Sequence, residues 1–434
     1  MHWAAVNNFQ YIRKIDSLPN RRRPDLIEEG SSVTGRQSHV LKKIKDIVER
    51  HCVKRYLLGV GLLLVVAAVS GCHTLGFYGQ ALKGQYQIVA HQKAIEKLES
   101  DPQTPEALRQ RFRLLAELRK FAHDQLKLPL DGHYRKYVDV HRPYVVWNVE
   151  ASPEFSMQPK TWWYPLVGSL EYRGYFSKNG ATNYAAYLRS KGYDVSVGGV
   201  EAYSTLGWFK DPVLNTFIFE PDADLAEIIF HELGHQRVFA RGDTDFNEAF
   251  ATTVGQEGAR RWLRANADAA TRDRYDIDLK HTREFAVLVM QTRLRLEALF
   301  GDERDENGKV KASRKPNPAS PDELRRQKAP LVEQLRKEYA ALKESWSGQS
   351  QYDQWFAREI NNAKLNSVAA YYDLVPGFEH LLALHGGDLE KFYDAAQRLS
   401  DKPTKERHEW LRTLGQTDPA LVPAAAAKSQ KTND

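Results

Sequence analysis

The sequence predicts an α+β fold in which a helical hairpin and a small mixed β-sheet precede a largely helical region. Residues 76–128 carry apolar side chains at helical intervals, with a break at Asp101-Pro102. From Ala223 onward the pattern is again helical. Between these regions, short runs rich in β-branched and aromatic residues predict about four strands, at residues 144–149, 166–170, 194–197 and 216–219.

Changes in composition divide the chain into segments. We expect the helical hairpin over residues 72–130 and the main domain over residues 131–420, with a further helix at residues 183–191. Residues 301–321 are charged and rich in Pro, Asn and Ser, which is typical of an exposed loop. We expect residues 421–434 to be a disordered tail.

The formal net charge of +6 is confined to the N-terminal part of the chain. Residues 1–71 hold 12 Lys and Arg against 6 Asp and Glu, and the remaining residues are balanced. A nucleic-acid-binding domain needs basic charge clustered on its folded surface. We therefore expect no nucleic-acid partner.

Both cysteines, Cys52 and Cys72, lie near the N-terminus. Because no cysteine follows Cys72, the main domain has neither a disulfide framework nor a thiolate metal site. A metal ion held by this domain must be bound by histidines and carboxylates.

Residues 53–71 have the pattern of a signal peptide. A basic stretch precedes an apolar run at residues 56–69, which is shorter than the ~20 residues of a transmembrane helix. The run ends in Val69-Ser70-Gly71-Cys72, which resembles the bacterial lipobox and implies cleavage before Cys72 and lipid attachment there. The alternative is an uncleaved membrane helix that ends in a chance cysteine.

This resemblance implies a lipid-anchored membrane protein of the bacterial cell envelope, facing the periplasm or the exterior. His73 rather than an acidic residue follows Cys72, which favours the outer membrane over the inner. Residues 1–52 are polar and basic and precede the signal. They are either a cytoplasmic extension or, as we favour, the result of a start site placed too early, with Val53 as the initiator.

The strongest chemical motif is His231-Glu232-Leu233-Gly234-His235. The flanking apolar pattern predicts a helix, on which residues four apart lie on one face. His231 and His235 can then share one Zn²⁺ at ~2.0–2.1 Å, and Glu232 can act on a water as general base. The alternative is a pair of surface histidines in a motif that arose by chance.

A catalytic zinc site needs a third protein ligand and one open position. Glu248 is our candidate, because Gly242 can end the first helix and Thr244 or Asp245 can cap a second that returns Glu248 to the histidines. In the alternative, Asp245 and Glu248 form a capping box and Glu248 only binds a backbone N–H. Glu257 is the reserve ligand.

Asn247-Glu248-Ala249-Phe250-Ala251 is similar to the N-E-x-x-A segment that follows H-E-x-x-H in gluzincins, which include the large zinc aminopeptidases. Residues 71–399 more closely resemble a predicted zinc aminopeptidase family of bacterial lipoproteins. Segments that carry this resemblance are residues 142–149, 198–200, 202–209 and 374–376, together with the zinc motif. It implies a zincin-like fold, one zinc ion per chain and a peptide substrate, with endopeptidase or carboxypeptidase action left open.

The chain departs from the larger gluzincins in two ways. Only 12 residues separate His235 from Glu248, so the turn between the helices must be tight. Gly255 stands where many zinc aminopeptidases carry a further Glu, which puts recognition of a free α-amine in doubt.

Two further groups are weaker candidates. Peptidases of this type usually supply a Tyr, His or Arg to the oxyanion, and Tyr371 is our choice, with a packing tyrosine as the commoner alternative. Gly198, Gly199 and Glu201 resemble a substrate-binding strand edge at which Glu201 could hold a peptide's amino terminus. A solvated surface glutamate is the alternative role for Glu201.

The sequence therefore predicts a zinc-dependent peptidase, with aminopeptidase action favoured by the resemblance. The rival is a zinc-stabilised, non-hydrolytic envelope protein that holds a partner. A fourth protein ligand would favour the rival, whereas the intact Glu232 argues against it because a structural site does not use a base. A third possibility is a lipoprotein whose motif binds no metal.

Overall fold

The computed structural model describes residues 4–6, 71–164, 168–204, 210–305, 310–311, 317–348 and 350–416. Its contacts divide the chain into one unit of Tyr11–Gln85 and another of Met1–Gln10 with Tyr86–Asp434. The structure describes the first unit only from residue 71, within helix α2 (Gly71–Ala90). Most of the predicted signal peptide, the upstream residues other than 4–6, and the predicted tail lie outside the described residues. No helix in the described part of the chain is both long and apolar enough to cross a bilayer.

The region predicted to be a helical hairpin contains more than two helices. It comprises α2, β2 (Lys93–Ala94), α3 (Ile95–Ser100) and α4 (Glu106–Asp124). The strand interrupts the helices because Ala94 pairs with Lys136 in an antiparallel ladder. Helix α4 follows the predicted periodicity, and its buried residues are spaced three to four apart: Phe112, Leu115, Leu118 and Ala122.

A three-stranded antiparallel sheet carries one side of the candidate site. Its order is β7-β4-β8, with β7 at Tyr172–Tyr175, β4 at Val146–Pro153 and β8 at Tyr193–Val200. Asn148 and Glu150 lie two residues apart on the central strand and share one face of the sheet. Helix α5 (Lys178–Arg189) packs on β4 and β8 and confirms the predicted helix, although it begins five residues earlier, where Ser177 caps it.

The remaining described strands are short and form separate small sheets. One is mixed, with β3 (Lys136–Val138) parallel to β10 (Val213–Leu214) and antiparallel to β2. The others pair β5 (Trp162–Tyr164) with β6 (Gly168–Leu170), β9 (Ala202–Ser204) with β1 (Ala4–Val6), and β11 (Glu303–Arg304) with β12 (Val310–Lys311). The α+β class is confirmed, but the predicted single sheet of about four strands is wrong because the strands are divided among several sheets.

The strand predicted at residues 216–219 is also wrong. These residues form a turn after β10, in which the Phe217 and Ile218 N–H groups both donate to the Leu214 carbonyl oxygen. Phe217 and Ile218 are buried all the same. The apolar pattern of residues 216–219 therefore predicted the burial of Phe217 and Ile218 correctly, but their backbone forms a turn and not a strand.

The chain is helical over most of its length after Ala223, as predicted. The helices are α6 (Asp222–Arg237), α7 (Thr244–Asn266), α8 (Ala269–Phe300), α9 (Pro321–Ser345), α10 (Asp353–Ala357), α11 (Asn362–Tyr372), α12 (Val375–Leu384), α13 (Leu389–Ser400) and α14 (Thr404–Gly415). Within the predicted exposed loop at residues 301–321, β11 and β12 pair with each other and Val310 is buried.

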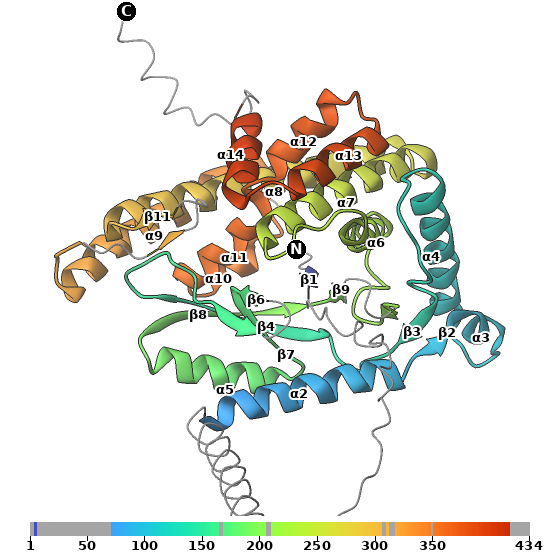
Figure 1. Ribbon diagram of the computed structural model, residues 1–434, viewed down its shortest axis with the longest axis horizontal. Helices are drawn as coiled ribbons and strands as arrows, with labels where there is room; N and C mark the ends of the chain where they lie inside the picture. The colour runs from blue at the N-terminus through green and yellow to red at the C-terminus, as the bar shows by residue number, and fades with distance from the viewer. Residues whose placement is uncertain are drawn as a thin grey trace, which may run out of the picture. The chain divides into compact units, whose positions relative to one another are not determined.

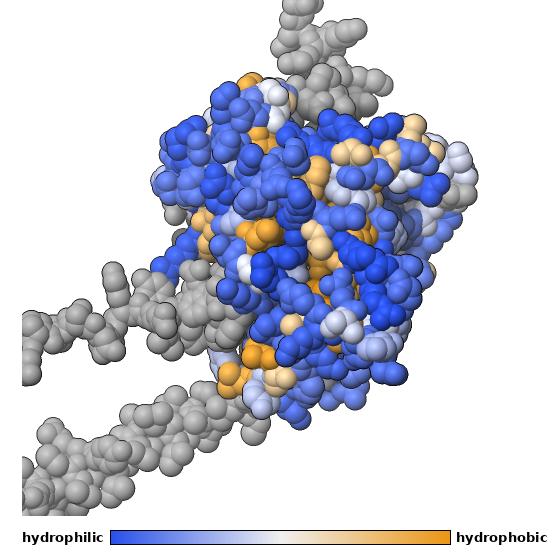
Figure 2. Space-filling model, turned by 90° about the vertical axis from the view of Figure 1, so that its right-hand side faces the viewer, coloured by the Kyte–Doolittle hydropathy of each residue, from blue (hydrophilic) through white to orange (hydrophobic). Residues whose placement is uncertain are grey.

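The β7-β4-β8 sheet lies between helices on its two faces (Figure 1). Helix α5 covers one face, whereas α11 packs against β4 and β8 and also contacts α7. The candidate site lies on the α11 and α7 side. On the face drawn in Figure 2, hydrophilic residues predominate and apolar residues form only small patches.

Candidate metal centre

Helices α6 and α7 pack closely, and two glycines permit this approach. A Cβ atom on Gly255 of α7 would lie 2.9 Å from the Glu227 carbonyl oxygen and 3.1 Å from the His231 Cβ. On α6, a Cβ atom on Gly234 would lie 3.3 Å from the Val254 Cβ. A glutamate side chain has no room at position 255 in this packing, which gives a physical reason for the departure from the larger gluzincins.

The turn between the two helices is tight, as the short spacing predicted. Helix α6 ends at Arg237, and Gly242 adopts a left-handed φ of 76° just before α7 begins. The residue that caps α7 is Asp243, whose Oδ1 accepts a hydrogen bond from the Phe246 N–H. The predicted caps, Thr244 and Asp245, are therefore wrong by one and two residues.

The position of this cap excludes one of the two roles considered for Glu248. A capping box requires the glutamate three residues after the capping residue. Glu248 lies five residues after Asp243, so its carboxylate is not used to close the start of α7. The capping-box alternative is wrong for this structure.

The side chains of His231, His235 and Glu248 meet between α6 and α7. The two histidine Nε2 atoms lie 3.2 Å apart. Glu248 Oε2 lies 3.4 Å from Nε2 of His231, and Oε1 lies 3.8 Å from Nε2 of His235. Ligand atoms arranged tetrahedrally at ~2.0–2.1 Å from zinc lie about 3.4 Å from one another. The observed spacing therefore fits one zinc ion.

Burial shifts the pKa values of His235 and Glu248 toward the neutral forms of both groups. Burial, followed by the charge of His231, lowers the pKa of His235 well below 6.5, so this imidazole is neutral at neutral pH and has a lone pair to offer. Burial raises the pKa of Glu248, an effect that its interaction with His231 only partly offsets. Glu248 Oε2 makes no hydrogen bond although it is buried, and a buried polar atom normally has a partner. A metal ion would supply that partner.

Glu232 is the most deeply buried carboxylate of the group. Its side chain is 1% exposed, and neither carboxylate oxygen has a hydrogen-bond partner. Burial raises the pKa of Glu232 well above 4.5, and the charges of Glu248 and Asp211 raise it further. A buried carboxylate without a partner costs folding free energy. A cation bound nearby would offset this cost, so the arrangement suits a carboxylate that acts beside a cation.

In the part of the chain that the structure describes, the candidate group at this point contains three residues and no fourth His, Cys, Asp or Glu. The reserve ligand, Glu257, is not among them. Its Oε1 lies 2.8 Å from Arg261 Nε, and Arg264 also pairs with it. Glu257 is therefore a partner of arginines on its own helix.

The structure places the weaker candidates as follows. Tyr371 lies in α11, but its side chain is outside the described residues. Gly198 and Gly199 lie in β8, an end strand of its sheet among the described strands, and Glu201 follows it, partly buried. A Cβ atom on Gly199 would lie 2.4 Å from the Tyr144 ring, so this glycine has a packing role. The substrate-binding role of these three residues stays a prediction.

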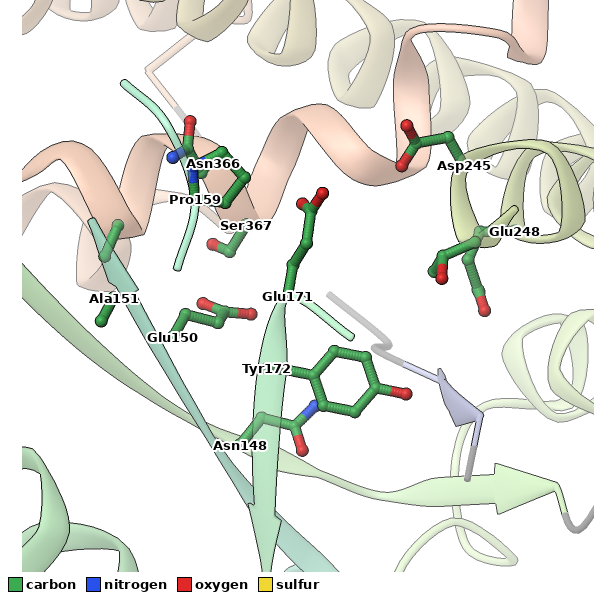
Figure 3. A pocket seen from close by; sticks show the side chains of 12 residues that line it. Asn148, Glu150, Ala151, Pro159, Glu171, Tyr172, Asp245, Glu248, Asn366 and Ser367 are labelled. Atoms are coloured by element: carbon green, nitrogen blue, oxygen red, sulfur yellow. The ribbon is translucent and has the colours of Figure 1, made fainter. Parts of the chain in front are cut away.

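Sequence reasoning missed a cavity beside the candidate metal ligand Glu248 (Figure 3). Glu248 lines it together with Asn148, Glu150, Glu171 and Tyr172, among others. Burial raises the pKa of Tyr172, and the charge of Glu248 is the next largest cause. The sequence feature that could have indicated this cavity is the pattern Asn148-Val149-Glu150, which places two polar residues on one face of an otherwise apolar strand.

Comparison with known proteins gives one family. The family described as "Putative aminopeptidase" matches residues 76–411. A search of curated proteins found no match, and neither did a search of solved structures. Because the match extends over more than half of the chain, the protein belongs to this family of putative aminopeptidases.

Proposed function

We propose that this chain is a zinc-dependent peptidase of the gluzincin type, acting as an aminopeptidase. His231, His235 and Glu248 hold one zinc ion, and Glu232 is the general base. The observation that carries the proposal is the meeting of three ligand atoms, at distances suited to one zinc ion, beside a buried carboxylate that has no hydrogen-bond partner. Membership of the family supports the aminopeptidase activity.

The proposed chemistry assigns a distinct task to each group. Zinc, when bound, lowers the pKa of a water molecule and polarises the scissile carbonyl. Glu232 accepts the proton of the attacking water and then delivers it to the leaving amine. Its raised pKa suits both transfers, because a group that holds its proton too weakly could not return it. The dry surroundings of Glu232 strengthen its electrostatic interactions with the reacting groups.

The alternative of a structural, non-hydrolytic zinc site is less well supported. A structural zinc site is closed by four protein ligands, whereas the described group here has three. A structural site also gains nothing from a buried, unpaired Glu232, which costs folding free energy. Both observations favour a site with an open position for water.

The proposal can be tested by metal analysis and peptide hydrolysis with the purified full-length chain. We expect about one zinc per chain, and hydrolysis that a chelator abolishes and added zinc restores. Glu248→Gln should lose most of the bound zinc. The matched control is Glu257→Gln on the same helix, which removes an arginine partner and should keep the metal. A chain that binds no zinc, or that loses zinc equally in both variants, contradicts the proposed site.

We also propose that the enzyme is a lipoprotein of the bacterial envelope, anchored through Cys72. Cys72 lies in α2, and its side chain is outside the described residues. Radiolabelled palmitate fed to bacteria producing the chain should label the wild type and the Cys52→Ser control, but not Cys72→Ser. Equal labelling of both variants would contradict the proposed anchor.

A further inference from the structure

Helix α2 exposes a row of large apolar side chains. Leu82 is 67% exposed, Tyr86 71% and Val89 41%. They lie four and three residues apart in one continuous helix, so they share one face of it. Phe77 and Ile88 are buried, and at about 100° per residue they lie on the other side of the helix. The row, which we call the α2 stripe, is therefore a second apolar face.

The α2 stripe differs from the other exposed apolar residues of the protein. No other helix in the part of the chain that the structure describes carries three exposed large apolar side chains. Apolar residues exposed singly are common on soluble proteins. A contiguous apolar face, by contrast, marks a contact with a partner or with a membrane.

The composition of α2 suits a membrane surface. The sequence of Gly71–Ala90 holds no Asp or Glu, and its one Lys or Arg is the exposed Lys83, which directly follows Leu82 and lies beside the stripe. Tyrosine and lysine are typical of the boundary between lipid and water, because each has an apolar body and a polar end. Anionic lipids attract a basic side chain, and α2 has no carboxylate that they would repel.

The chain that precedes the stripe indicates what covers it. Cys72, the proposed site of lipid attachment, is the second residue of α2, and the apolar run at residues 56–69 ends just before the helix. A lipid on Cys72 and an uncleaved membrane helix would both hold the start of α2 at the bilayer surface. At 1.5 Å per residue, Leu82 lies ~15 Å and Val89 ~26 Å along the helix from Cys72. The stripe is therefore within reach of that surface.

We propose that the α2 stripe lies on the membrane, with Leu82, Tyr86 and Val89 inserted at the boundary between lipid headgroups and acyl chains. An amphipathic helix in this position buries its apolar face about 5–10 Å deep. Stable anchoring of a lipidated protein commonly takes two signals, and the stripe supplies the second. The inference rests on the proposed attachment through Cys72 and adds the protein surface that contacts the lipid.

Fluorescence quenching by spin-labelled lipids tests this placement. The full-length chain, produced in bacteria with Cys52→Ser as the parent, is reconstituted into vesicles of phosphatidylethanolamine and phosphatidylglycerol. Leu82→Cys and Val89→Cys, each labelled with a thiol-reactive fluorophore, should lose most of their fluorescence when the lipids carry a nitroxide high on the acyl chain. The matched control is Gln87→Cys, which is exposed on the same helix but away from the stripe and should keep its fluorescence.

A charge placed on the stripe gives a second test. With the fluorophore on Tyr86→Cys, Leu82→Asp should abolish most of the quenching, because a carboxylate is driven out of the lipid. Flotation with the vesicles should persist, since the lipid anchor is unchanged. Gln87→Asp adds the same charge on another face and should leave the quenching as it was. Quenching that is equal with and without Leu82→Asp would overturn the inference.

The outcomes separate this inference from the proposed anchor. Thiol labelling of the denatured parent reports whether Cys72 is free. If Cys72 is free but the labels at positions 82 and 89 are quenched, the anchor proposal fails and the inference stands. If Cys72 is lipidated and neither label is quenched, the anchor stands and the inference fails. Labels that are shielded from aqueous iodide but not quenched by the lipids would show that protein covers the stripe, which also overturns the inference.

Discussion

The side-chain amide of Asn247 makes both of its hydrogen bonds to Ala240. Its Oδ1 accepts from the Ala240 N–H at 2.7 Å, and its Nδ2 donates to the Ala240 carbonyl oxygen at 2.8 Å. Ala240 lies in the turn after α6, and Asn247 directly precedes the proposed ligand Glu248 on α7. This pair of bonds therefore fixes the turn that brings Glu248 to the histidines.

We predict that Asn247→Ala weakens both folding and zinc binding. The substitution leaves the Ala240 N–H unpaired in a buried place, at a cost of about 1–3 kcal/mol, while the Ala240 carbonyl oxygen keeps only its bond from the Asp243 N–H. Loss of a residue that orients a metal ligand typically lowers metal affinity about 10–100-fold. Urea unfolding and zinc titration against a chelator measure the two effects. The control is Asn266→Ala, which removes one amide bond at the far end of α7 and should leave zinc affinity unchanged. Unaltered zinc affinity in Asn247→Ala would show that Asn247 does not position Glu248.

Gly255 gives a second prediction about the packing of α6 on α7. Gly255→Ala should destabilise the protein by about 1–3 kcal/mol, because its Cβ would press on the Glu227 carbonyl oxygen and on His231. Zinc affinity should fall with it, since His231 must move. The control is Gly79→Ala in α2, where a Cβ would meet nothing within 4 Å. That substitution should be neutral or stabilise by up to about 1 kcal/mol. Similar effects of the two substitutions on stability and zinc binding would contradict close packing at Gly255.

Asp243 joins the start of α7 to α14 and predicts a dependence of stability on pH. Its Oδ2 lies 2.7 Å from Nε of Arg407 and 2.7 Å from Nε2 of His408. Burial alone would raise the pKa of Asp243, but the bonds and charges of His408 and Arg407 outweigh it and hold the pKa below 3.8. The ionised carboxylate therefore stabilises the fold fully above the unfolded-state pKa. This contribution is lost as the pH falls through the lower, folded-state pKa.

Asp243→Asn should accordingly lower the free energy of unfolding at neutral pH by about 3–5 kcal/mol, the usual cost of breaking a buried ion pair. The loss of stability on acidification below about pH 4 should be shallower in the variant than in the wild type. Thermal unfolding followed over a pH series measures both effects. Glu406→Gln removes an exposed partner of Lys402 and serves as control, with an expected effect of about 0–1 kcal/mol. Parallel pH profiles for wild type and Asp243→Asn would exclude Asp243 as the source of the acid sensitivity.

The two adjacent glycines of β8 should respond differently to substitution. A Cβ on Gly199 would lie 2.4 Å from the Tyr144 ring, whereas a Cβ on Gly198 would meet nothing within 4 Å. Gly199→Ala should therefore destabilise the protein by roughly 1–3 kcal/mol, and Gly198→Ala should have little effect on folding. If Gly198→Ala nevertheless raises KM for a peptide, the strand edge binds substrate as the sequence suggested. An unchanged KM would leave these glycines with structural roles only.

The sequence predicted the local part of the site well. Helical spacing alone placed His231 and His235 on one face of α6, and the 12-residue interval predicted the tight turn to Glu248. The exact cap could not be chosen in this way, because Asp243, Thr244 and Asp245 can all accept a backbone hydrogen bond. Asp243 caps α7 in a structure where α14 supplies Arg407 and His408 to the same carboxylate, and that contact spans 164 residues of sequence.

The sequence pattern could not predict the arrangement of the strands or the acidic cavity. Residues 216–219 show the apolar character of a strand, but they enter the core through a turn. The cavity draws Glu150, Glu171 and Glu248 from separate elements. No local periodicity links such residues, because their proximity depends on the packing of the β7-β4-β8 sheet against α7 and α11.

The most direct test of the account is the zinc content and peptidase activity of Glu232→Gln measured on the same preparation. The substitution keeps the size of the side chain and removes the base without touching the three proposed ligands. The account predicts zinc at the wild-type level of about one per chain, with kcat lowered roughly 10²- to 10⁴-fold. Peptide cleavage at the wild-type rate by a zinc-loaded Glu232→Gln chain would contradict it.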